Sequence, residues 1–167
     1  MIGIGIGTHS SGARRGPNLI TNGGASGTTD WTDTNTDGIA DDWELQSGAG
    51  TPAIVTGNGF TGNAQRIPHV TGTLTRFRQI IGGVGTIGDT YGFKMKYRTD
   101  WAEAWRIYAC GVTEAIDMNL AINAGNAISY SGEVTLASAA NMILNFYNLG
   151  ANPSCFIEID EILFYKK

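Results

Sequence analysis

The sequence predicts an all-β protein, a β-sandwich of the jelly-roll type that follows an extended N-terminal tail. Glycine accounts for 24 of the 167 residues without a collagen-like triplet period. Charged residues make up only 16%, below the roughly 25% of an average globular domain. Short runs of Val, Ile, Thr and aromatic residues recur between turn residues, a spacing typical of sandwiches and jelly rolls.

The predicted strands follow one another from Pro17 to the C-terminus. The clearest lies at 91–98, where aromatic residues and Met alternate with Lys and Arg, so we expect the apolar set to face the core. The full set of predicted strands is 18–22, 53–56, 64–67, 74–81, 91–98, 105–112, 126–134, 142–147 and 156–165.

Residues 1–16 form a tail distinct from the rest, and we assign the domain to residues 17–167. In an extended strand the tail's isoleucines project on one side, while the glycines between them allow close backbone approach. This suits strand addition to the sheet edge of a partner or sister copy, with the arginines near an acidic surface; a disordered terminus is the alternative. The attachment residues are Ile2, Ile4, Ile6, Arg14 and Arg15.

Residues 33–44 match the calcium-loop pattern D-x-[DN]-x-[DN]-G-x5-E. Ca²⁺ binds oxygen ligands in flexible geometry, and Gly38 permits the sharp turn. Because no helix flanks the loop, we expect it to order a connection between strands rather than act as an EF-hand sensor. A solvated acidic turn is the alternative. The expected ligands are Asp33, Asn35, Asp37, the Ile39 carbonyl, Asp41 and Glu44.

Composition argues against several classes of function. A net charge of −4 argues against nucleic-acid binding, which favours a strongly basic face. No apolar run approaches the ~18 residues of a membrane helix. The N-terminus lacks a secretory signal, which favours release from the cell without secretion over a trimmed precursor. The recurring cations predict a solvated strand face; they are Arg76, Arg78, Lys94, Lys96 and Arg98.

Catalysis is not expected. His9 and His69 are far apart and lack metalloprotease or triad context, and we expect His69 at the surface. No pair of carboxylates can be nominated for glycoside hydrolysis. Cys110 and Cys155 lack metal spacing, so we expect buried free thiols.

Short motifs occur in a recognisable order at 18–23, at 37–43, at Gln79 with 88–97, and at 159–164. In this order, over residues 17–167, the chain resembles the jelly-roll carbohydrate-binding modules of the family 4, 9 and 16 type. The resemblance implies a galactose-binding-like sandwich. It also implies a structural Ca²⁺ between the first and last strands, with Asp160 as a ligand. Gly24 and its neighbours replace the family's Phe-Glu; a buried Asp160 satisfied by backbone donors is the alternative.

Sugar-binding members of that family use exposed aromatic side chains. Trp101, in a turn between two predicted strands, is the best candidate platform, whereas we expect Trp43 and Trp105 to be buried. The tail and domain together resemble non-catalytic components of phage virions, such as capsid decorations, head fibres or fibre tips. This implies a virion location after host lysis, contacts with other virion proteins and a host-surface glycan as ligand. The alternative is a carbohydrate-binding module of a secreted polysaccharide-degrading enzyme.

Overall fold

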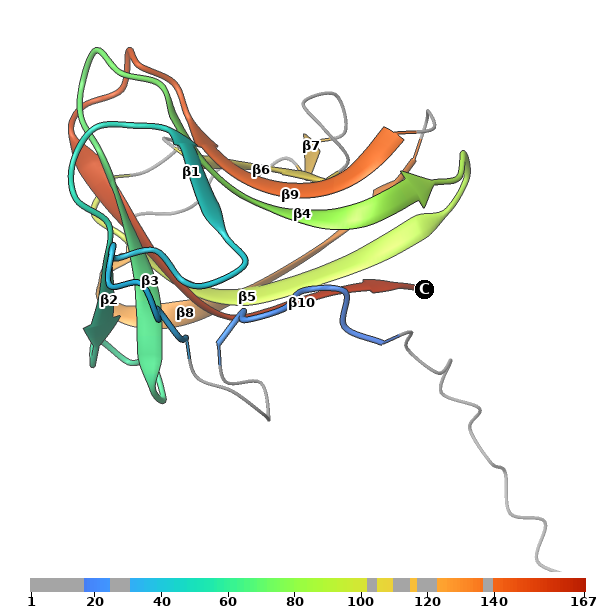
Figure 1. Ribbon diagram of the computed structural model, residues 1–167, viewed down its shortest axis with the longest axis horizontal. Helices are drawn as coiled ribbons and strands as arrows, with labels where there is room; N and C mark the ends of the chain where they lie inside the picture. The colour runs from blue at the N-terminus through green and yellow to red at the C-terminus, as the bar shows by residue number, and fades with distance from the viewer. Residues whose placement is uncertain (1–16, 25–30, 102–104, 110–114, 117–122, 137–139) are drawn as a thin grey trace, which may run out of the picture.

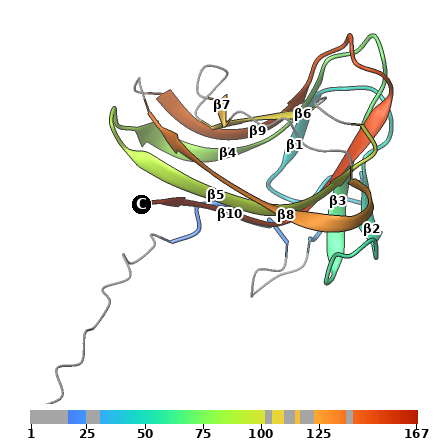
Figure 2. The ribbon, with the colours of Figure 1, turned by 180° about the vertical axis from the view of Figure 1, so that it is seen from behind.

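The computed structural model describes residues 17–24, 31–101, 105–109, 115–116, 123–136 and 140–167. Two antiparallel five-stranded sheets pack face to face, as Figure 1 shows from the side and Figure 2 from behind. All regular elements among the described residues are strands, and the described part contains no helix that could span a membrane. The predicted all-β jelly-roll sandwich is confirmed.

The chain alternates between the two sheets, so neighbouring strands are mostly distant in sequence. Sheet I has the order β1 (Glu44–Ser47), β4 (Thr75–Gly85), β9 (Ala140–Asn148), β6 (Trp105–Ala109) and β7 (Ala115–Ile116). Sheet II has the order β2 (Ala53–Thr56), β3 (Asn63–His69), β10 (Cys155–Lys166), β5 (Thr90–Thr99) and β8 (Asn123–Thr135). We did not predict β1, because its sequence Glu-Leu-Gln-Ser lacks β-branched and aromatic residues.

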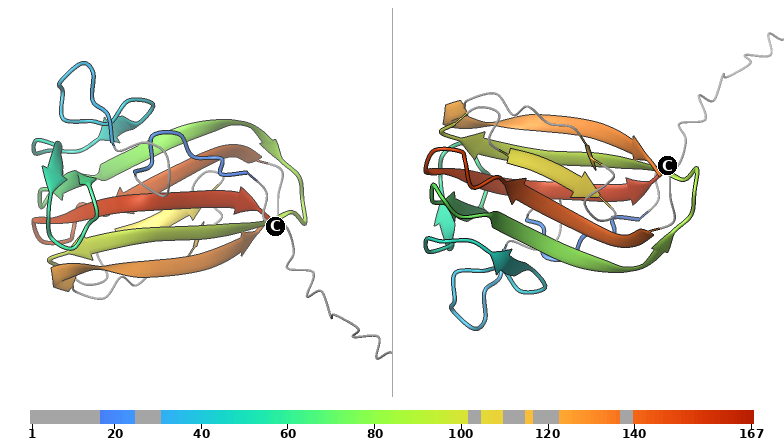
Figure 3. Two further views of the ribbon diagram at one scale, coloured as in Figure 1. Left: turned by 90° about the horizontal axis from the view of Figure 1, so that it is seen from below. Right: turned by 90° about the horizontal axis from the view of Figure 1, so that it is seen from above.

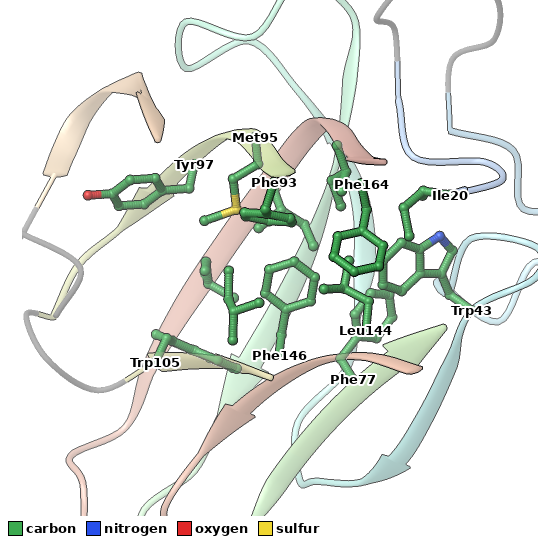
Figure 4. Packing of buried hydrophobic residues seen from close by; sticks show 14 of the residues in the cluster. Ile20, Trp43, Phe77, Phe93, Met95, Tyr97, Trp105, Leu144, Phe146 and Phe164 are labelled. Atoms are coloured by element: carbon green, nitrogen blue, oxygen red, sulfur yellow. The ribbon is translucent and has the colours of Figure 1, made fainter. Parts of the chain in front are cut away.

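Aromatic side chains from both sheets fill the space between them (Figure 4). Trp105, Phe77 and Phe146 are completely buried. Trp43, just ahead of β1, stacks on Phe77 with 4.9 Å between ring centroids and 5° between ring planes. Such aromatic pairs contribute about 0.5–1.5 kcal/mol beyond the area they bury. The predicted burial of Trp43 and Trp105 is confirmed, as is the inward-facing apolar set of β5.

The N-terminal segment of the domain completes the edge of β10. Strand β3 pairs with β10 only along residues 155–159. Beyond that point Leu19 N–H donates to the Phe164 carbonyl over 2.7 Å, and Ile162 N–H donates to the Gly23 carbonyl over 2.8 Å. The segment 18–22 was predicted as a strand but is irregular, and it ends at Asn22 with a φ of 46°, a left-handed conformation outside the extended region of regular strands.

His69 is buried between the sheets, and its predicted surface location was wrong. It is only 1% exposed. Its Nδ1 lies 3.0 Å from the Thr75 hydroxyl on β4, and its Nε2 lies 3.3 Å from the Asn152 carbonyl. The imidazole lies edge-on to Trp105. These contacts link the end of β3 in sheet II to sheet I. The surface prediction relied on the place of His69 after Pro68 at a strand end, and that local signal does not reveal a contact between sheets.

Candidate ligand-binding face

The outer face of sheet I is concave, because β4 and β9 curve away from sheet II (Figure 1). The right panel of Figure 3 looks onto this side of the sandwich. Side chains that alternate with the core residues of β1, β4, β6 and β9 point outward there. We call this surface the concave face; its described residues are Glu44, Arg76, Arg78, Ile80, Arg106, Tyr108, Ile143, Asn145 and Tyr147.

Two tyrosines on neighbouring strands form the centre of the concave face. The rings of Tyr108 and Tyr147 meet edge to face, with 5.7 Å between centroids and 87° between planes. Tyr147 lies opposite Arg76 of β4 on one side and opposite Arg106 of β6 on the other. The Arg76 guanidinium lies 5.2 Å from the centroid of the Tyr147 ring, a cation–π distance. An aromatic pair is thus flanked by hydrogen-bond donors.

A second cross-strand row lies beside the first. Asn145 lies opposite Arg78 of β4 and Tyr108 of β6. Arg78 in turn lies opposite Glu44 of β1 and forms an ion pair with it. Strand register therefore places an acid, a guanidinium, an amide and a phenol in a single line across the sheet.

Two polar atoms on this face are buried and lack a hydrogen-bond partner among the described residues. They are Oδ1 of Asn145, an acceptor, and Nε of Arg76, a donor. Leaving such a group unsatisfied costs about 1–3 kcal/mol, and buried polar groups in native proteins nearly always have a partner. Hydroxyl groups of a bound ligand could both donate to Asn145 and accept from Arg76.

Trp101 lies after β5 and is 46% exposed, so its predicted exposure is confirmed. It lies in the connection that leads to β6, and its backbone N–H is 3.4 Å from the Thr99 hydroxyl. It is not on the outward-facing rows that carry Tyr108 and Tyr147. Whether it contacts a sugar stays a prediction.

The loop at 33–44 is held by side-chain to backbone hydrogen bonds. Gly38 N–H donates to Asp33 Oδ2 over 2.8 Å, and Ile39 N–H donates to Asp37 Oδ1 over 2.8 Å. Asn35 Oδ1 accepts from the N–H of Asp37. Gly38 has a φ of +82°, and a Cβ there would lie 2.2 Å from the Pro52 carbonyl oxygen. The sharp turn predicted at this glycine is confirmed.

The proposed calcium ligands are only partly gathered. Asp41 accepts from the backbone N–H and hydroxyl of Thr34 and from the Thr32 hydroxyl, and these bonds lower its pKa. Glu44 is engaged with Arg78 on the concave face. Within the described ranges no three His, Cys, Asp or Glu side chains form a group that could hold a metal ion. Asp33 Oδ1 is nevertheless buried, with no hydrogen-bond partner in the described part of the chain.

Asp160 is fully buried on β10. Its Oδ1 accepts a hydrogen bond from the indole N–H of Trp31 over 3.0 Å, whereas the alternative to a calcium role assumed backbone donors. Gly24, with a φ of +83°, lies against this carboxylate, and a Cβ there would come within 1.7 Å of Oδ1. Any side chain at position 24, such as the family's phenylalanine, would therefore require a different backbone. A calcium role for Asp160 stays a prediction.

The predicted attachment residues lie outside the described residues, as do His9 and Cys110. They are Ile2, Ile4, Ile6, Arg14 and Arg15. Cys155 is a buried free thiol, as predicted, and burial raises its pKa to about 11. It is therefore unreactive at neutral pH.

A hollow of about 270 Å³ lies on the opposite side of the molecule, on the outer face of sheet II. It forms where β10 shifts register between Asp160 and Leu163, a bulge in which Glu161 has a φ of 49°. Glu161 pairs with Lys96 across this hollow, and Lys94 contributes to the lining.

No family model matches the chain, and no curated protein matches it. Among solved structures, a CBM4 carbohydrate-binding module aligns with 76% of this chain and 96% of its own, at 12% identity and a TM-score of 0.55. An arabinose-bound GH51 α-L-arabinofuranosidase aligns with 95% of this chain at 12% identity and a TM-score of 0.64, but over only 28% of its own length. Tailspike protein 4 of bacteriophage CBA120 aligns with 90% of this chain and 21% of its own, at 13% identity and a TM-score of 0.58. At these identities the similarities show the fold alone.

Proposed function

We propose that this chain is a glycan-binding module and that its binding surface is the concave face. The observation that carries the proposal is the Tyr108–Tyr147 pair beside two buried polar atoms, on Asn145 and Arg76, that lack partners among the described residues. The jelly-roll likeness to a CBM4 module supports it. An open sheet surface of this kind suits a polymer chain better than a small enclosed ligand.

The chemistry of the surface matches that of a saccharide. Pyranose rings present an apolar C–H face and an equatorial rim of hydroxyls, while ligand sites combine aromatic walls with a few placed polar groups. Tyr147 would lie under the apolar face, Asn145 Oδ1 would accept from one hydroxyl, and Arg76 Nε would donate to another. Each hydrogen bond contributes about 0.5–1.5 kcal/mol net, so we expect micromolar to millimolar dissociation constants.

A module of this kind would hold a larger polysaccharide-degrading protein on its substrate, without catalysis of its own. This setting, rather than a virion, is the one we propose, because the CBM4 module is matched over nearly its whole length. The likeness to part of a phage tailspike is one of fold, and a virion location with its protein partners stays a prediction.

Isothermal titration calorimetry against a panel of soluble polysaccharides tests the proposal. The panel would include neutral β-glucans, xylan and arabinan together with acidic polymers. We expect binding to at least one polymer, and we expect Tyr147→Ala to reduce that affinity at least tenfold while the melting temperature stays close to that of the parent. Trp101→Ala is the matched control, because Trp101 is exposed but lies off the concave face. No binding to any polymer, or equal losses in both variants, would overturn the proposal.

A calcium ion in the loop at 33–44 remains part of the proposal as a stabiliser of the fold. The buried Asp33 Oδ1 is the observation that favours it, and oxygen atoms of Asn35, Asp37 and the Ile39 carbonyl are of the type that Ca²⁺ binds. Glu44 is the weakest member of the predicted set, because it pairs with Arg78.

A further inference from the structure

The described residues of the concave face carry more positive than negative charge, although the whole chain has a net charge of −4. Its described charged residues are three arginines and one glutamate, and the glutamate is paired with one of the arginines. The other two arginines are Arg76 and Arg106, which flank Tyr147 in the strand register.

On the opposite face of the sandwich, most positively charged side chains are paired with carboxylates. On the outer face of sheet II, Arg98 and Arg66 both pair with the buried carboxylate of Glu158, at 2.8 and 3.5 Å. Lys96 pairs with Glu161. Most cations of sheet II thus have a carboxylate nearby, whereas Arg76 has none in the part of the chain that the structure describes.

The positions of the two arginines suit recognition of an anion on a sugar. Neighbouring strands lie about 4.8 Å apart, so the backbones of Arg76 and Arg106 stand roughly 10 Å apart with Tyr147 between them. Arg76 lies over the Tyr147 ring and has a buried Nε without a partner among the described residues. Arg106 is exposed, and its Nη1 reaches 3.5 Å from the Tyr108 hydroxyl. A guanidinium fork binds a carboxylate through two parallel N–H donors.

We propose that the concave face selects acidic glycans, polymers whose sugar units carry a carboxylate. This inference rests on the proposed glycan-binding function and specifies its ligand class. A sugar unit stacked on Tyr147 would direct its carboxylate toward the guanidinium of Arg76 or Arg106. Successive units of a polyuronate repeat the charge along the chain, so a linear polymer can engage both arginines.

Calorimetry with polygalacturonate and its fully methyl-esterified form tests the proposal, because esterification keeps the backbone and removes the charge. We expect polygalacturonate to bind at least tenfold more tightly than the ester, since charge-assisted hydrogen bonds are about twice as strong as neutral ones. We also expect the affinity to fall as salt rises from about 20 to 500 mM, because salt screens exposed charges.

Arg76→Gln and Arg106→Gln should each weaken binding to polygalacturonate roughly tenfold and leave binding to the ester unchanged. Lys94→Gln removes one positive charge from the hollow on sheet II and should leave both affinities unchanged. If Arg76→Gln fails to fold, Arg106→Gln still tests the proposal. Alginate serves as a second polyuronate, and a DNA duplex serves as a polyanion without sugar carboxylates.

The outcomes separate the two proposals. Binding to neutral polysaccharides or to the ester as tight as binding to the polyuronates would overturn the acidic selectivity and leave the glycan-binding function standing. Equal affinity for DNA would overturn it as well, because the face would then be a general polyanion surface. Binding to no saccharide would overturn both proposals.

Discussion

Tyr147 on β9 meets Tyr108 on β6 edge to face, and each alternates with a core residue of its strand, Phe146 or Ile107, so both lie on the concave side of sheet I. The strands that carry them are hydrogen-bonded neighbours, with Tyr147 opposite Arg106 and Tyr108 opposite Asn145. A β-sheet holds such a set rigidly, because each position is fixed by the ladder and by the buried residue that precedes it along the strand, Ile107 or Phe146. Binding would therefore require little additional ordering of the protein. The entropy lost when a binding site becomes ordered often limits affinity.

His69 makes the stability of the fold dependent on pH. Burial lowers its pKa below the ordinary value of 6.5, and the hydrogen bond to the Asn152 carbonyl opposes this shift only in part. The folded state therefore binds the proton more weakly than the unfolded state. Its contribution to stability is present above pH 6.5 and is lost progressively as pH falls below that value. Urea denaturation between pH 8 and 5 should show this loss.

His69→Gln provides the control for that measurement, because glutamine cannot titrate. The free energy of unfolding of this variant should vary less between pH 7 and 5 than that of the parent chain, whatever its absolute stability. A parallel decline in both proteins would mean that other groups cause the acid sensitivity.

Calcium should stabilise the domain through the loop at 33–44. Extracellular calcium modules bind at about 0.1–1 mM, and a hundredfold excess over Kd adds about 2.7 kcal/mol. The melting temperature should then rise by about 5–10 °C, given roughly 2–4 °C per kcal/mol for a domain of this size. Differential scanning fluorimetry with Ca²⁺ and with EDTA measures the shift.

Two variants identify the ligands of that ion. Asp37→Ala should abolish the calcium-dependent shift, whereas Glu44→Gln should leave most of it, because Glu44 is held by Arg78 on the concave face. If EDTA and Ca²⁺ give the same melting temperature in the parent chain, the loop is a solvated acidic turn.

The N-terminal tail is predicted to attach the domain to a sister copy or another protein. Deleting residues 1–16 should leave a folded monomer, since the described domain begins at Pro17 and its Asn18 and Leu19 are hydrogen-bonded to β10. Light scattering coupled to gel filtration should show a larger species for the full chain than for the truncated one. A monomer mass for both chains would contradict attachment to a sister copy.

Much of the fold could be predicted from local sequence patterns. The alternation of aromatic residues with Lys and Arg over 91–98 predicted the inward and outward faces of β5 correctly, because the two-residue period directly reflects the strand geometry. The alternation of Arg76 and Arg78 with apolar residues likewise predicted that both side chains face away from the core, and both are half-buried on the outer face of β4. Turn-rich stretches separated the strands.

The candidate site could not be predicted in the same way. Tyr108 and Tyr147 are distant in the sequence and meet only because β6 pairs with β9, a long-range register that a single sequence does not specify. Each tyrosine follows a buried residue, Ile107 or Phe146, and that alternation was the available signal of its exposure. Sequence reasoning instead selected Trp101, an exposed aromatic residue in a turn.

Backbone NMR titration with the oligosaccharide that binds best in the panel tests the location of the site most directly. We predict that the largest amide shift changes fall on β4, β6 and β9, around Arg76, Tyr108 and Tyr147, and that they disappear in Tyr147→Ala. Shift changes confined to the turn at Trp101, or to the residues that line the hollow on sheet II, would contradict a binding site on the concave face.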